Sequence, residues 1–408
     1  MPFEFLTLDD VDVKGKTIFL RVDVNSPIDP STERILDDSR IKAIAQTRQE
    51  LRAARVVLGS HQSRPGRYDF TSLQAHARVI QMYYDGPVKF IDDIIGPKAL
   101  EAIESLKTGE ILVLDNLRKI DEENRNMPPE EAAKTRLVEA LAPHFDLVVN
   151  VAFAAAHRSQ PSLIGFGELL PMVAGRLMQR ELEALERVLE NPDRPCIFIL
   201  GGAKVEDRLP VIDRVLREGI ADKVLLGGLV QEPFLMARGY LSKRLENLGD
   251  EERHLVDEAS KLLENYGDRI ELPVDLALDV GGERVEVGVG KLTDETNIYD
   301  IGLNTIVRYI DEVKAAGTVV AEGPLGMFER RGFHIGTKEL LRAMAECRGY
   351  TLLGGGHLGA MASLLGLEGK IDHISTGGGA LLTLLAGAPM PVIEALKRAK
   401  EKWGSQQG

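Results

Sequence analysis

Cationic side chains recur at the ends of four short apolar runs in the first half of the chain. The runs are TIFLRVDVN (17–25), RVVLGSHQSRPG (55–66), ILVLDNLR (111–118) and LVVNVAFAAAHR (147–158). Guanidinium groups bind phosphate and carboxylate through paired, charge-assisted hydrogen bonds. These residue types predict a site for a small, multiply charged anion. The side chains concerned are Arg21, Asp23, Asn25, His61, Arg64, Arg118, His157 and Arg158.

The second half of the chain places glycine where the first half places arginine. Its apolar runs are CIFILGGAK (196–204), KVLLGG (223–228), TVVAEGPLG (318–326), YTLLGGG (350–356) and HISTGGG (373–379). Glycine leaves backbone N–H groups open to close approach, and a helix N-terminus that follows such a turn favours phosphate. We therefore predict a nucleotide-phosphate site here and, with the anion site, a small-molecule phosphotransferase.

Two doubly wound sheets would position these residues. Apolar runs alternate with helical stretches such as 71–84 and 130–143 from about 15 to 165, and the alternation resumes from about 194 to 385. This pattern is typical of βαβ units in a parallel sheet, whose ligands bind beyond the carboxyl ends of the strands. A length of 408 residues exceeds what one core usually serves. We expect an α/β fold with two Rossmann-like domains joined by a hinge helix.

The domain boundaries follow from where the alternation stops. We expect an N-terminal anion-binding domain over 1–168 and a C-terminal nucleotide-binding domain over 193–385. Between them, residues 169–192 carry apolar side chains at helical spacing and predict one long helix. The final segment, 386–408, is polar at its end and is expected either to fray or to pack back onto the first domain.

Charge and composition narrow the class of protein. The net charge of −13 disfavours nucleic acid or an anionic membrane as a partner, because a field of that sign repels phosphate backbones. Cys196 and Cys347 show no metal-ligand spacing, which fits a reducing compartment. The amino terminus is acidic, unlike a signal peptide, and no apolar run is long enough to span a membrane. We therefore expect a cytoplasmic protein.

Each candidate in the first half has a plainer alternative. Asp23 and Asn25 could hold hydroxyl groups of a polyol acid, but both types are also common turn residues. Lone surface arginines are usually solvated, yet Arg64, Arg118 and Arg158 occupy equivalent positions after three strands, which favours a clamp. Arg40 is a further cation, whose alternative is a salt bridge to Asp37 or Asp38.

The candidates in the second half are weighed in the same way. Lys204 follows a glycine turn at a presumed helix start, where it adds a mobile positive charge at the point of transfer. The spacing is not that of a P-loop. Glu329 could accept hydrogen bonds from ribose hydroxyls, although a lone glutamate is more often plain surface. One glycine triplet alone could serve packing, whereas the two at 354–356 and 377–379 favour a ligand.

Taken in order, RVDVNSP, SHQSRP, DNLR, NVAFAAAHR, LGGAKVEDR, GPLGMFE, GGG and STGGGA resemble the phosphoglycerate kinase family across nearly the full chain. The sequences SHQSRPG and AFAAAHRSQPS are similar to those of the archaeal branch of this family. The resemblance implies a monomeric, hinged two-domain kinase that transfers a phosphoryl group between ATP and 3-phosphoglycerate, giving ADP and 1,3-bisphosphoglycerate, with Mg²⁺ as cofactor. It implies no metal held by protein residues alone.

The resemblance also implies roles for individual residues. Arg40 and Lys204 would meet the transferred phosphoryl group. The glycerate would be bound by Asp23, Asn25, Arg40, His61, Arg64, Arg118 and Arg158. The nucleotide would be bound by Gly201, Gly202, Lys204, Arg208, Gly302, Glu329, Gly355, Gly356, His357 and Leu358.

Four positions depart from the family pattern, mostly near the nucleotide. Val151 stands in place of an acid, Arg208 in place of a second lysine, Glu322 in place of an asparagine, and His357 in place of an acid after the glycine triplet. Imidazole is a poor ligand for Mg²⁺, which prefers oxygen, so the metal must be placed by other groups. Two alternatives stay open: a paralogue that binds phosphoglycerate with weakened or lost transfer, and a kinase for a different small acid.

Overall fold

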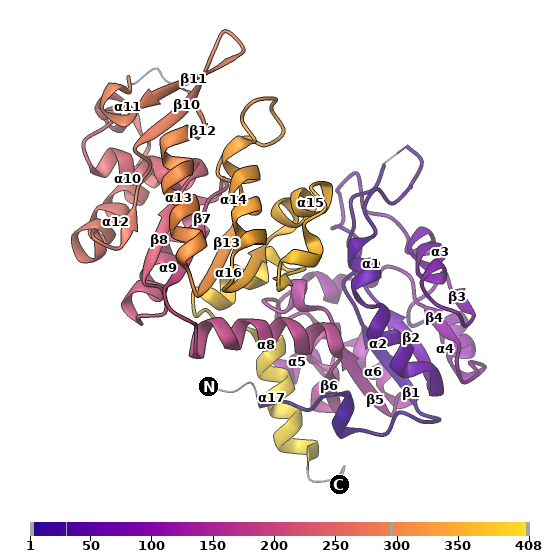
Figure 1. The fold of residues 1–408 in the computed structure, drawn as a ribbon. Coiled ribbons are helices and arrows are strands. Elements are labelled where there is room, and N and C mark those ends of the chain that lie inside the picture. The colour runs from indigo at the N-terminus through magenta and orange to yellow at the C-terminus, as the bar shows by residue number, and fades with distance from the viewer. Residues whose placement is uncertain (1–3, 30, 294–296, 405–408) are drawn as a thin grey trace. The chain divides into compact units, whose positions relative to one another are not determined.

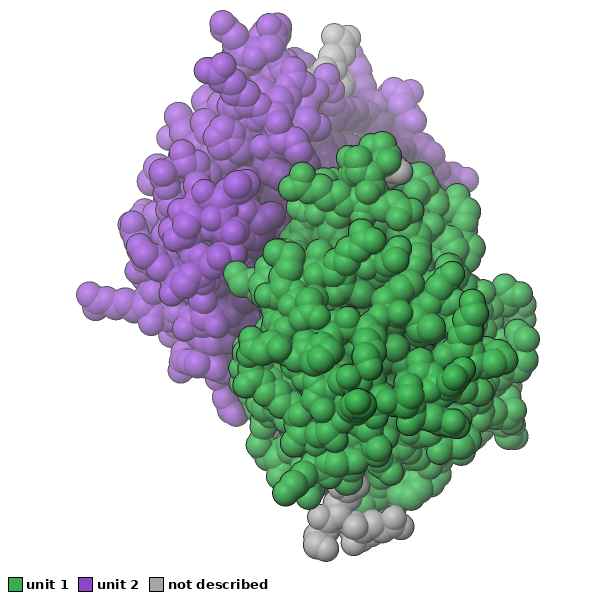
Figure 2. All heavy atoms as spheres, turned by 90° about the vertical axis from the view of Figure 1, so that its right-hand side faces the viewer, with its two compact units in different colours: residues 1–183, 389–408 green, residues 184–388 purple. Residues whose placement is uncertain are grey.

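The computed structural model describes residues 4–29, 31–293 and 297–404. Its chain divides into two compact units (Figure 2). Unit 1 comprises residues 1–183 and 389–408, and unit 2 comprises residues 184–388. The boundary between Glu183 and Ala184 falls inside a single helix, α8 (Arg176–Glu190).

Unit 1 is built on a six-stranded sheet in the order β3-β4-β2-β1-β5-β6, with every pairing parallel (Figure 1). Its central strand, β1, is buried at all five positions. Parallel sheets covered on both faces need such continuous apolar runs. The strands are β1 (Thr17–Arg21), β2 (Arg55–Gly59), β3 (Val88–Phe90), β4 (Ile111–Val113), β5 (Leu147–Asn150) and β6 (Met172–Ala174).

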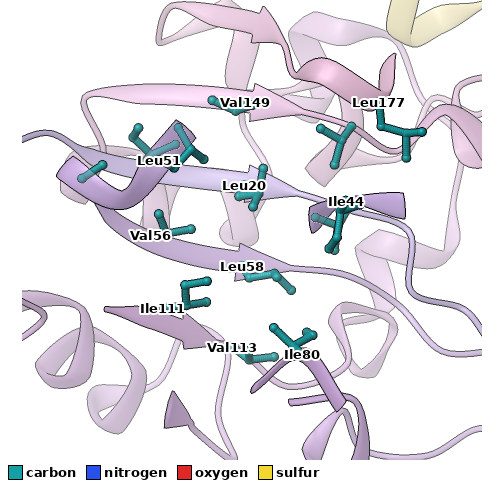
Figure 3. Close-up of a cluster of buried hydrophobic side chains, with 14 of the residues drawn as sticks. Leu20, Ile44, Leu51, Val56, Leu58, Ile80, Ile111, Val113, Val149 and Leu177 are labelled. Atoms are coloured by element: carbon teal, nitrogen blue, oxygen red, sulfur yellow. The ribbon is translucent and has the colours of Figure 1, made fainter. Parts of the chain in front are cut away.

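The helices of unit 1 cover both faces of this sheet. On one face, Leu20, Leu58 and Val113 pack with Ile44, Ile80 and other helical side chains in one buried cluster (Figure 3). On the other face, Phe19 packs on Phe145 and Phe166, with ring centroids 5.3 and 4.7 Å away. The helices are α1 (Ser39–Ala43), α2 (Ala45–Glu50), α3 (Gln74–Met82), α4 (Pro97–Glu104), α5 (Pro129–Ala132), α6 (Arg136–Leu141), α7 (Pro161–Ile164), the first part of α8, and α17 (Pro391–Trp403).

Unit 2 repeats this architecture with a sheet in the order β15-β14-β13-β7-β8-β9, again all parallel. One face carries Ile199, Ala321 and Leu353, which pack with helical residues such as Tyr309 and Leu341. The strands are β7 (Cys196–Leu200), β8 (Lys223–Leu226), β9 (Ile270–Glu271), β13 (Thr318–Glu322), β14 (Tyr350–Gly354) and β15 (His373–Ile374). The helices are α9 (Val205–Arg217), α10 (Gln231–Ala237), α11 (Ser242–Asn247), α12 (Asp250–Tyr266), α13 (Leu303–Ala315), α14 (Ile335–Glu346), α15 (Gly356–Leu364) and α16 (Gly378–Leu385).

A separate antiparallel sheet interrupts the alternation that the sequence predicted for unit 2. Its strands are β10 (Asp275–Val280), β11 (Glu283–Gly288) and β12 (Ile298–Ile301), in the order β11-β10-β12. The turn between β10 and β11 is Gly281-Gly282, with φ values of 64° and 91°. A Gly-Gly pair between two alternating runs is a hairpin signal, because the favoured two-residue turns need positive φ. That signal was present in the sequence and identifies the hairpin.

The segment 169–192 is not the single long helix that its spacing predicted. Residues Met172–Ala174 form β6, which pairs with β5, and α8 begins only at Arg176. Pro171 and Gly175 flank the strand, and Gly175 N–H donates to Asn150 O over 2.9 Å. A Cβ on Gly175 would lie 2.4 Å from Val151, so the chain needs glycine between strand and helix. Pairing with a buried strand therefore overrides the helical spacing.

The last helix, α17, packs within unit 1. Val392 N–H donates to Ala156 O over 3.2 Å, Arg398 pairs with Glu168 over 3.3 Å, and Trp403 Nε1 donates to Gly167 O over 3.3 Å. Residues 405–408 lie outside the described part of the chain.

The predicted fold class, two doubly wound parallel-sheet domains, is confirmed. Among the described helices, none has the length and apolar character needed to span a bilayer.

Candidate functional site

The register of the sheet gathers the candidate side chains of unit 1 at one edge. Arg21, the last residue of β1, pairs with Gly59 on one side and with Asn150 on the other. The segments that follow β1, β2 and β5 therefore leave the sheet at the same level, as parallel strands require. These segments carry the residues from Asp23 to Asn25, from His61 to Arg64, and from His157 to Arg158.

Three of the predicted clamp arginines line one cavity of about 770 Å³ in unit 1, together with His157. They are Arg64, Arg118 and Arg158, from the segments that follow three different strands. The remaining lining residues are Pro65, Asp121, Asn124, Arg125, Asn126 and Gln160. The cavity therefore presents several guanidinium groups to a ligand, as an anion clamp needs.

The cations of this cavity are close enough to oppose one another. Burial and the charges of Arg158, Arg21 and Arg64 lower the pKa of Arg118 to about 10. Burial also lowers the pKa of Arg158, with Arg64 and Arg40 adding to the effect and Asp23 opposing it. Arg118 is held in place because Nη1 donates to Ser63 O. An anion that enters this cavity relieves the mutual repulsion, which favours multiply charged ligands.

Arg40 pairs with Asp23 and not with its sequence neighbours Asp37 and Asp38. Arg40 Nη1 lies 2.8 Å from Asp23 Oδ2, and Asp38 accepts instead from the Tyr83 hydroxyl over 2.6 Å. Burial tends to raise the pKa of Asp23, but Arg40, the Asn25 N–H and Arg21 outweigh it, so this pKa lies below the usual range. Asp23 is therefore a carboxylate at neutral pH and can accept hydrogen bonds from hydroxyl groups.

Asn25 and the two histidines of this region are neutral hydrogen-bonding groups. Asn25 Oδ1 accepts from Ser63 N–H over 2.8 Å, which fixes the loop that leads to Arg64. Burial lowers the pKa of His61 well below its usual value, and the neighbouring arginines add to the effect. Burial and Arg158 lower the pKa of His157 to about 4. Arg158 Nε donates to His157 Nε2 over 3.3 Å, so the imidazole orients this arginine.

A buried charge network that the sequence did not reveal interacts electrostatically with Arg118. Arg21 and Glu123 are both fully buried, 3.6 Å apart, and Arg21 Nε donates to Ser162 Oγ over 2.7 Å. Ser162 N–H donates to Glu123 Oε2 over 2.9 Å. Burial raises the pKa of Glu123 although Arg21 opposes the rise. Glu123 lies in the polar run DEEN, which carries no signal for burial.

A second buried network holds the loop after β2. His76 Nε2 lies 3.0 Å from Gln62 Oε1, which also accepts from Ser26 N–H over 3.0 Å. The amide orientation of Gln62 is thereby fixed, so His76 Nε2 is the donor. Burial lowers the pKa of His76 to about 4. Gln62 is in turn bound to Asn116, which links the loops that carry Arg64 and Arg118.

In unit 2, as in unit 1, neighbouring strands end at the same level of the sheet. Glu322, the last residue of β13, pairs with Leu200 of β7 and with Gly354 of β14. The turns that follow the strands border one cavity of about 570 Å³. The predicted nucleotide residues among its lining are Gly202, Lys204, Arg208, Glu329, Gly355, Gly356, His357 and Leu358.

Two of the predicted nucleotide residues do not border this cavity. Gly302 precedes α13, and a Cβ there would lie 2.3 Å from the carboxyl carbon of Asp275. Gly201 packs against the segment that follows β13, where a Cβ would come within 2.4 Å of Pro324 O. Both glycines therefore allow close packing of backbone.

Backbone forms much of the cavity wall in unit 2. Gly355 has φ 85° and ψ 149°, a conformation that side-chain-bearing residues rarely adopt, and α15 begins directly after it. The first turns of α9 and α16 border the same cavity. Helix N-termini carry unpaired N–H groups and a partial positive charge, so three of them converging on one cavity suit phosphate.

The charged side chains of this cavity include an exposed lysine and a buried ion pair, and Asp207, Asp300 and Glu329 also border it. Lys204 precedes α9 and its side chain is 73% exposed, with Nζ 4.0 Å from Asp207. Arg208 and Glu322 are in direct contact, with side chains 7% and 6% exposed. Burial raises the pKa of Glu322 to about 7, although Arg208 opposes the rise. Two positions that depart from the family pattern thus form one ion pair.

Apolar side chains that the sequence did not point to also line this cavity. They are Leu229, Ile298, Tyr299, Met327 and Phe328. Leu229 and Met327 are about half exposed, at 46% and 48%. The His357 ring lies 5.3 Å from the Phe328 ring, so this departure from the family pattern extends the apolar wall. A planar base fits such a wall next to a phosphate site.

Comparison with known proteins agrees with this geometry. The family model described as phosphoglycerate kinase matches residues 8–388. The chain is 47% identical to the phosphoglycerate kinase of Methanococcus maripaludis over 98% of this chain and 99% of the relative. It is 47% identical to that of Saccharolobus solfataricus over 96% of both chains.

Solved structures give the same result. The crystal structure of phosphoglycerate kinase from Pyrococcus horikoshii superimposes with a TM-score of 0.90 at 43% identity, covering 97% of this chain and 100% of that one. The enzyme from Coxiella burnetii superimposes with a TM-score of 0.79 at 29% identity, covering 97% of this chain and 99% of that one. The chain, with its arginine-lined and glycine-lined cavities, therefore belongs to the phosphoglycerate kinase family.

Proposed function

We propose that the protein is a phosphoglycerate kinase that transfers a phosphoryl group reversibly between ATP and the carboxylate of 3-phosphoglycerate. The observation that carries the proposal is the cavity of unit 1, which is lined by Arg64, Arg118 and Arg158. Their guanidinium groups suit the 3-phosphate, while Asp23 and Asn25 suit the hydroxyl group of the acid. The glycine-lined cavity of unit 2 would hold the nucleotide.

The chemistry needs charge neutralisation and alignment, and it needs no nucleophilic side chain. The acceptor is a carboxylate, which is already ionised at neutral pH, so no general base is required. Lys204, Arg40 and the N-termini of the helices in unit 2 would neutralise charge on the transferred group. Because each substrate binds to a different unit, transfer requires a hinge movement that brings both together and excludes water from the acyl phosphate.

A magnesium ion would arrive with the nucleotide, beside the carboxylates of Asp207 and Glu329 that border the cavity. The described residues hold no group of three or more His, Cys, Asp or Glu side chains that could bind a metal. Glu322 is paired with Arg208, and Asp300 is fully buried against Arg284. Oxygen ligands would come from the phosphates, as Mg²⁺ commonly binds. When bound there, the ion would add positive charge beside the phosphate oxygens.

The direct test is turnover of the purified protein. With 3-phosphoglycerate, ATP and Mg²⁺, we expect 1,3-bisphosphoglycerate, detected by coupling to an NADH-dependent dehydrogenase. Tight 3-phosphoglycerate binding without turnover would favour the binding paralogue, and turnover only with another acid would favour the kinase of different specificity. We further propose that the enzyme acts as a monomer in the cytoplasm, as the resemblance implies; analytical ultracentrifugation tests the first point.

A further inference from the structure

The ion pair between Arg208 and Glu322 lies where the nucleotide phosphates are expected. Glu322 ends β13, and its backbone carbonyl accepts from Gly201 N–H over 2.8 Å, beside the turn that leads to Lys204. Its carboxylate reaches the opposite turn as well, because Oε1 lies 3.1 Å from the position a Cβ would take on Gly355. Glu322 therefore stands between the two glycine turns that border the cavity of unit 2.

Arg208 is held at two points. Nη2 contacts Glu322 Oε2, and Nη1 donates to the carbonyl oxygen of Lys204 over 3.0 Å. Nε donates to no atom of the described residues, so the guanidinium retains an unsatisfied donor. Nη2 also lies 3.3 Å from the position of a Cβ on Gly202, a turn with φ 85°. The carboxylate thus fixes where the guanidinium lies relative to the first glycine turn.

Because Arg208 and Glu322 are both buried, each needs the opposite charge of the other. A carboxylate at the floor of a phosphate site would repel the ligand unless a cation neutralised it, and a buried guanidinium without a carboxylate would lose its fixed position. Arginine also differs from lysine, because its planar fork can contact two groups at once while lysine is a flexible point charge. The two residues are therefore expected to depend on each other.

We propose that Glu322 is a positioning residue, which holds Arg208 in the orientation that contacts the nucleotide phosphates, so that the two residues act as one unit. This inference rests on the proposed function of unit 2 as the nucleotide-binding unit. It differs from a purely structural ion pair in one respect: nucleotide affinity, and not only stability, must depend on the partnership.

A double-mutant cycle on the full-length protein tests the proposal, with ADP binding measured by calorimetry in the absence of 3-phosphoglycerate. Arg208→Lys leaves Glu322 free to draw the ammonium away from the phosphates, and Glu322→Asn releases the guanidinium. We expect each single substitution to weaken ADP binding about 10-fold, and the double variant Arg208→Lys/Glu322→Asn to return within about threefold of the wild type. Glu322→Gln, which keeps the shape of the side chain, is expected to weaken ADP binding less than Glu322→Asn.

Arg217→Lys is the matched control, because the exposed Arg217 lies on the same helix and pairs with Asp213. It should leave ADP binding unchanged, and thermal melting of each variant checks folding. Effects that simply multiply in the double variant, or tighter ADP binding by Glu322→Asn, would overturn the proposal. Because the readout is nucleotide binding, a wild-type protein that binds ADP without turning over 3-phosphoglycerate would count against the proposed function and leave the cycle readable.

Discussion

The two cavities offer different groups to an anion: side chains in unit 1 and mainly backbone in unit 2. In unit 1 the groups that face the ligand are side-chain cations, of which Arg118 donates to Ser63 O and Arg158 donates to His157. In unit 2 the groups are largely backbone N–H donors at helix starts, with Lys204 as the exposed cation. A side-chain site must stabilise the charges it assembles, whereas a backbone site must keep its turns free of side chains. Substitutions should therefore damage the two units in different ways.

The largest effect is expected where the side-chain site depends on buried charge. Glu123→Ala leaves the fully buried Arg21 without its carboxylate, and should destabilise unit 1 by about 3–5 kcal/mol. The sole tryptophan, Trp403, lies in unit 1, so its fluorescence during urea unfolding reports this unit. Asp85→Ala is the control, because its pair with Arg52 is exposed and worth no more than about 1 kcal/mol. Equal effects of the two variants would show that the buried network stabilises unit 1 no more than an exposed ion pair does.

The lysine of the backbone site should matter most for the transfer step. Lys204→Ala removes the mobile cation, and we expect kcat to fall by roughly 10²–10³ while 3-phosphoglycerate binding changes little. Steady-state kinetics and calorimetry with 3-phosphoglycerate separate these two effects. Lys223→Ala serves as the control, since Lys223 pairs with Glu312 and does not border the cavity. An active Lys204→Ala enzyme would show that backbone donors suffice.

Acidification should destabilise unit 1 through the buried His76. The pKa of His76 is lowered by burial from 6.5 to about 4, so the unfolded chain takes up the proton more readily. The contribution of His76 to stability is therefore complete above about pH 6.5 and is lost as the pH falls towards 4, by on the order of 3 kcal/mol. His76→Gln should flatten this part of the pH profile of unit 1, again followed by Trp403 fluorescence. Identical slopes for both proteins would exclude His76 as the cause.

Removing one arginine should have a smaller effect, because several cations share the ligand. Arg64→Ala loses one charge-assisted contact, worth roughly 1.5–3 kcal/mol, and should raise the KM for 3-phosphoglycerate about 10- to 100-fold. Nucleotide affinity should not change. Arg67→Ala is the matched control, an exposed arginine of the same loop that does not border the cavity. A KM that stays at the wild-type value would contradict the clamp.

The smallest effect tests the backbone site itself. Gly355→Ala forces a side chain into a conformation that suits glycine, and should destabilise unit 2 by about 1–3 kcal/mol. Gly356→Ala is the matched variant one residue later, inside α15, where a Cβ meets nothing within 4 Å. It should be neutral or stabilising, because alanine favours helix. Thermal melting of both variants measures the difference, and equal melting temperatures would mean that the turn tolerates a side chain.

The sequence predicted those features that depend on residues close together in the chain, such as the ends of strands and the glycine turns. Strand ends located Arg64, Arg118 and Arg158, and glycine runs located the turn at Gly355, because a parallel sheet brings strand ends to one edge. The partners of these residues could not be predicted in the same way. Arg208 and Glu322 are 114 positions apart, and only the pairing of β7 with β13 brings them together. The predicted helix over 169–192 was wrong for a related reason, because residues 172–174 form a strand by pairing with β5.

The placement of α17 has a consequence for the order in which the protein is made. Unit 1 includes α17, Pro391–Trp403, yet the ribosome synthesises all of unit 2, residues 184–388, before it reaches that helix. At roughly 5–20 residues per second, translation of that stretch takes about 10–40 s. During this time the nascent first unit exposes the surface that α17 later covers, around Ala156 and Gly167. The unit that begins first is therefore completed last, and unit 2 can be the first to reach its finished form.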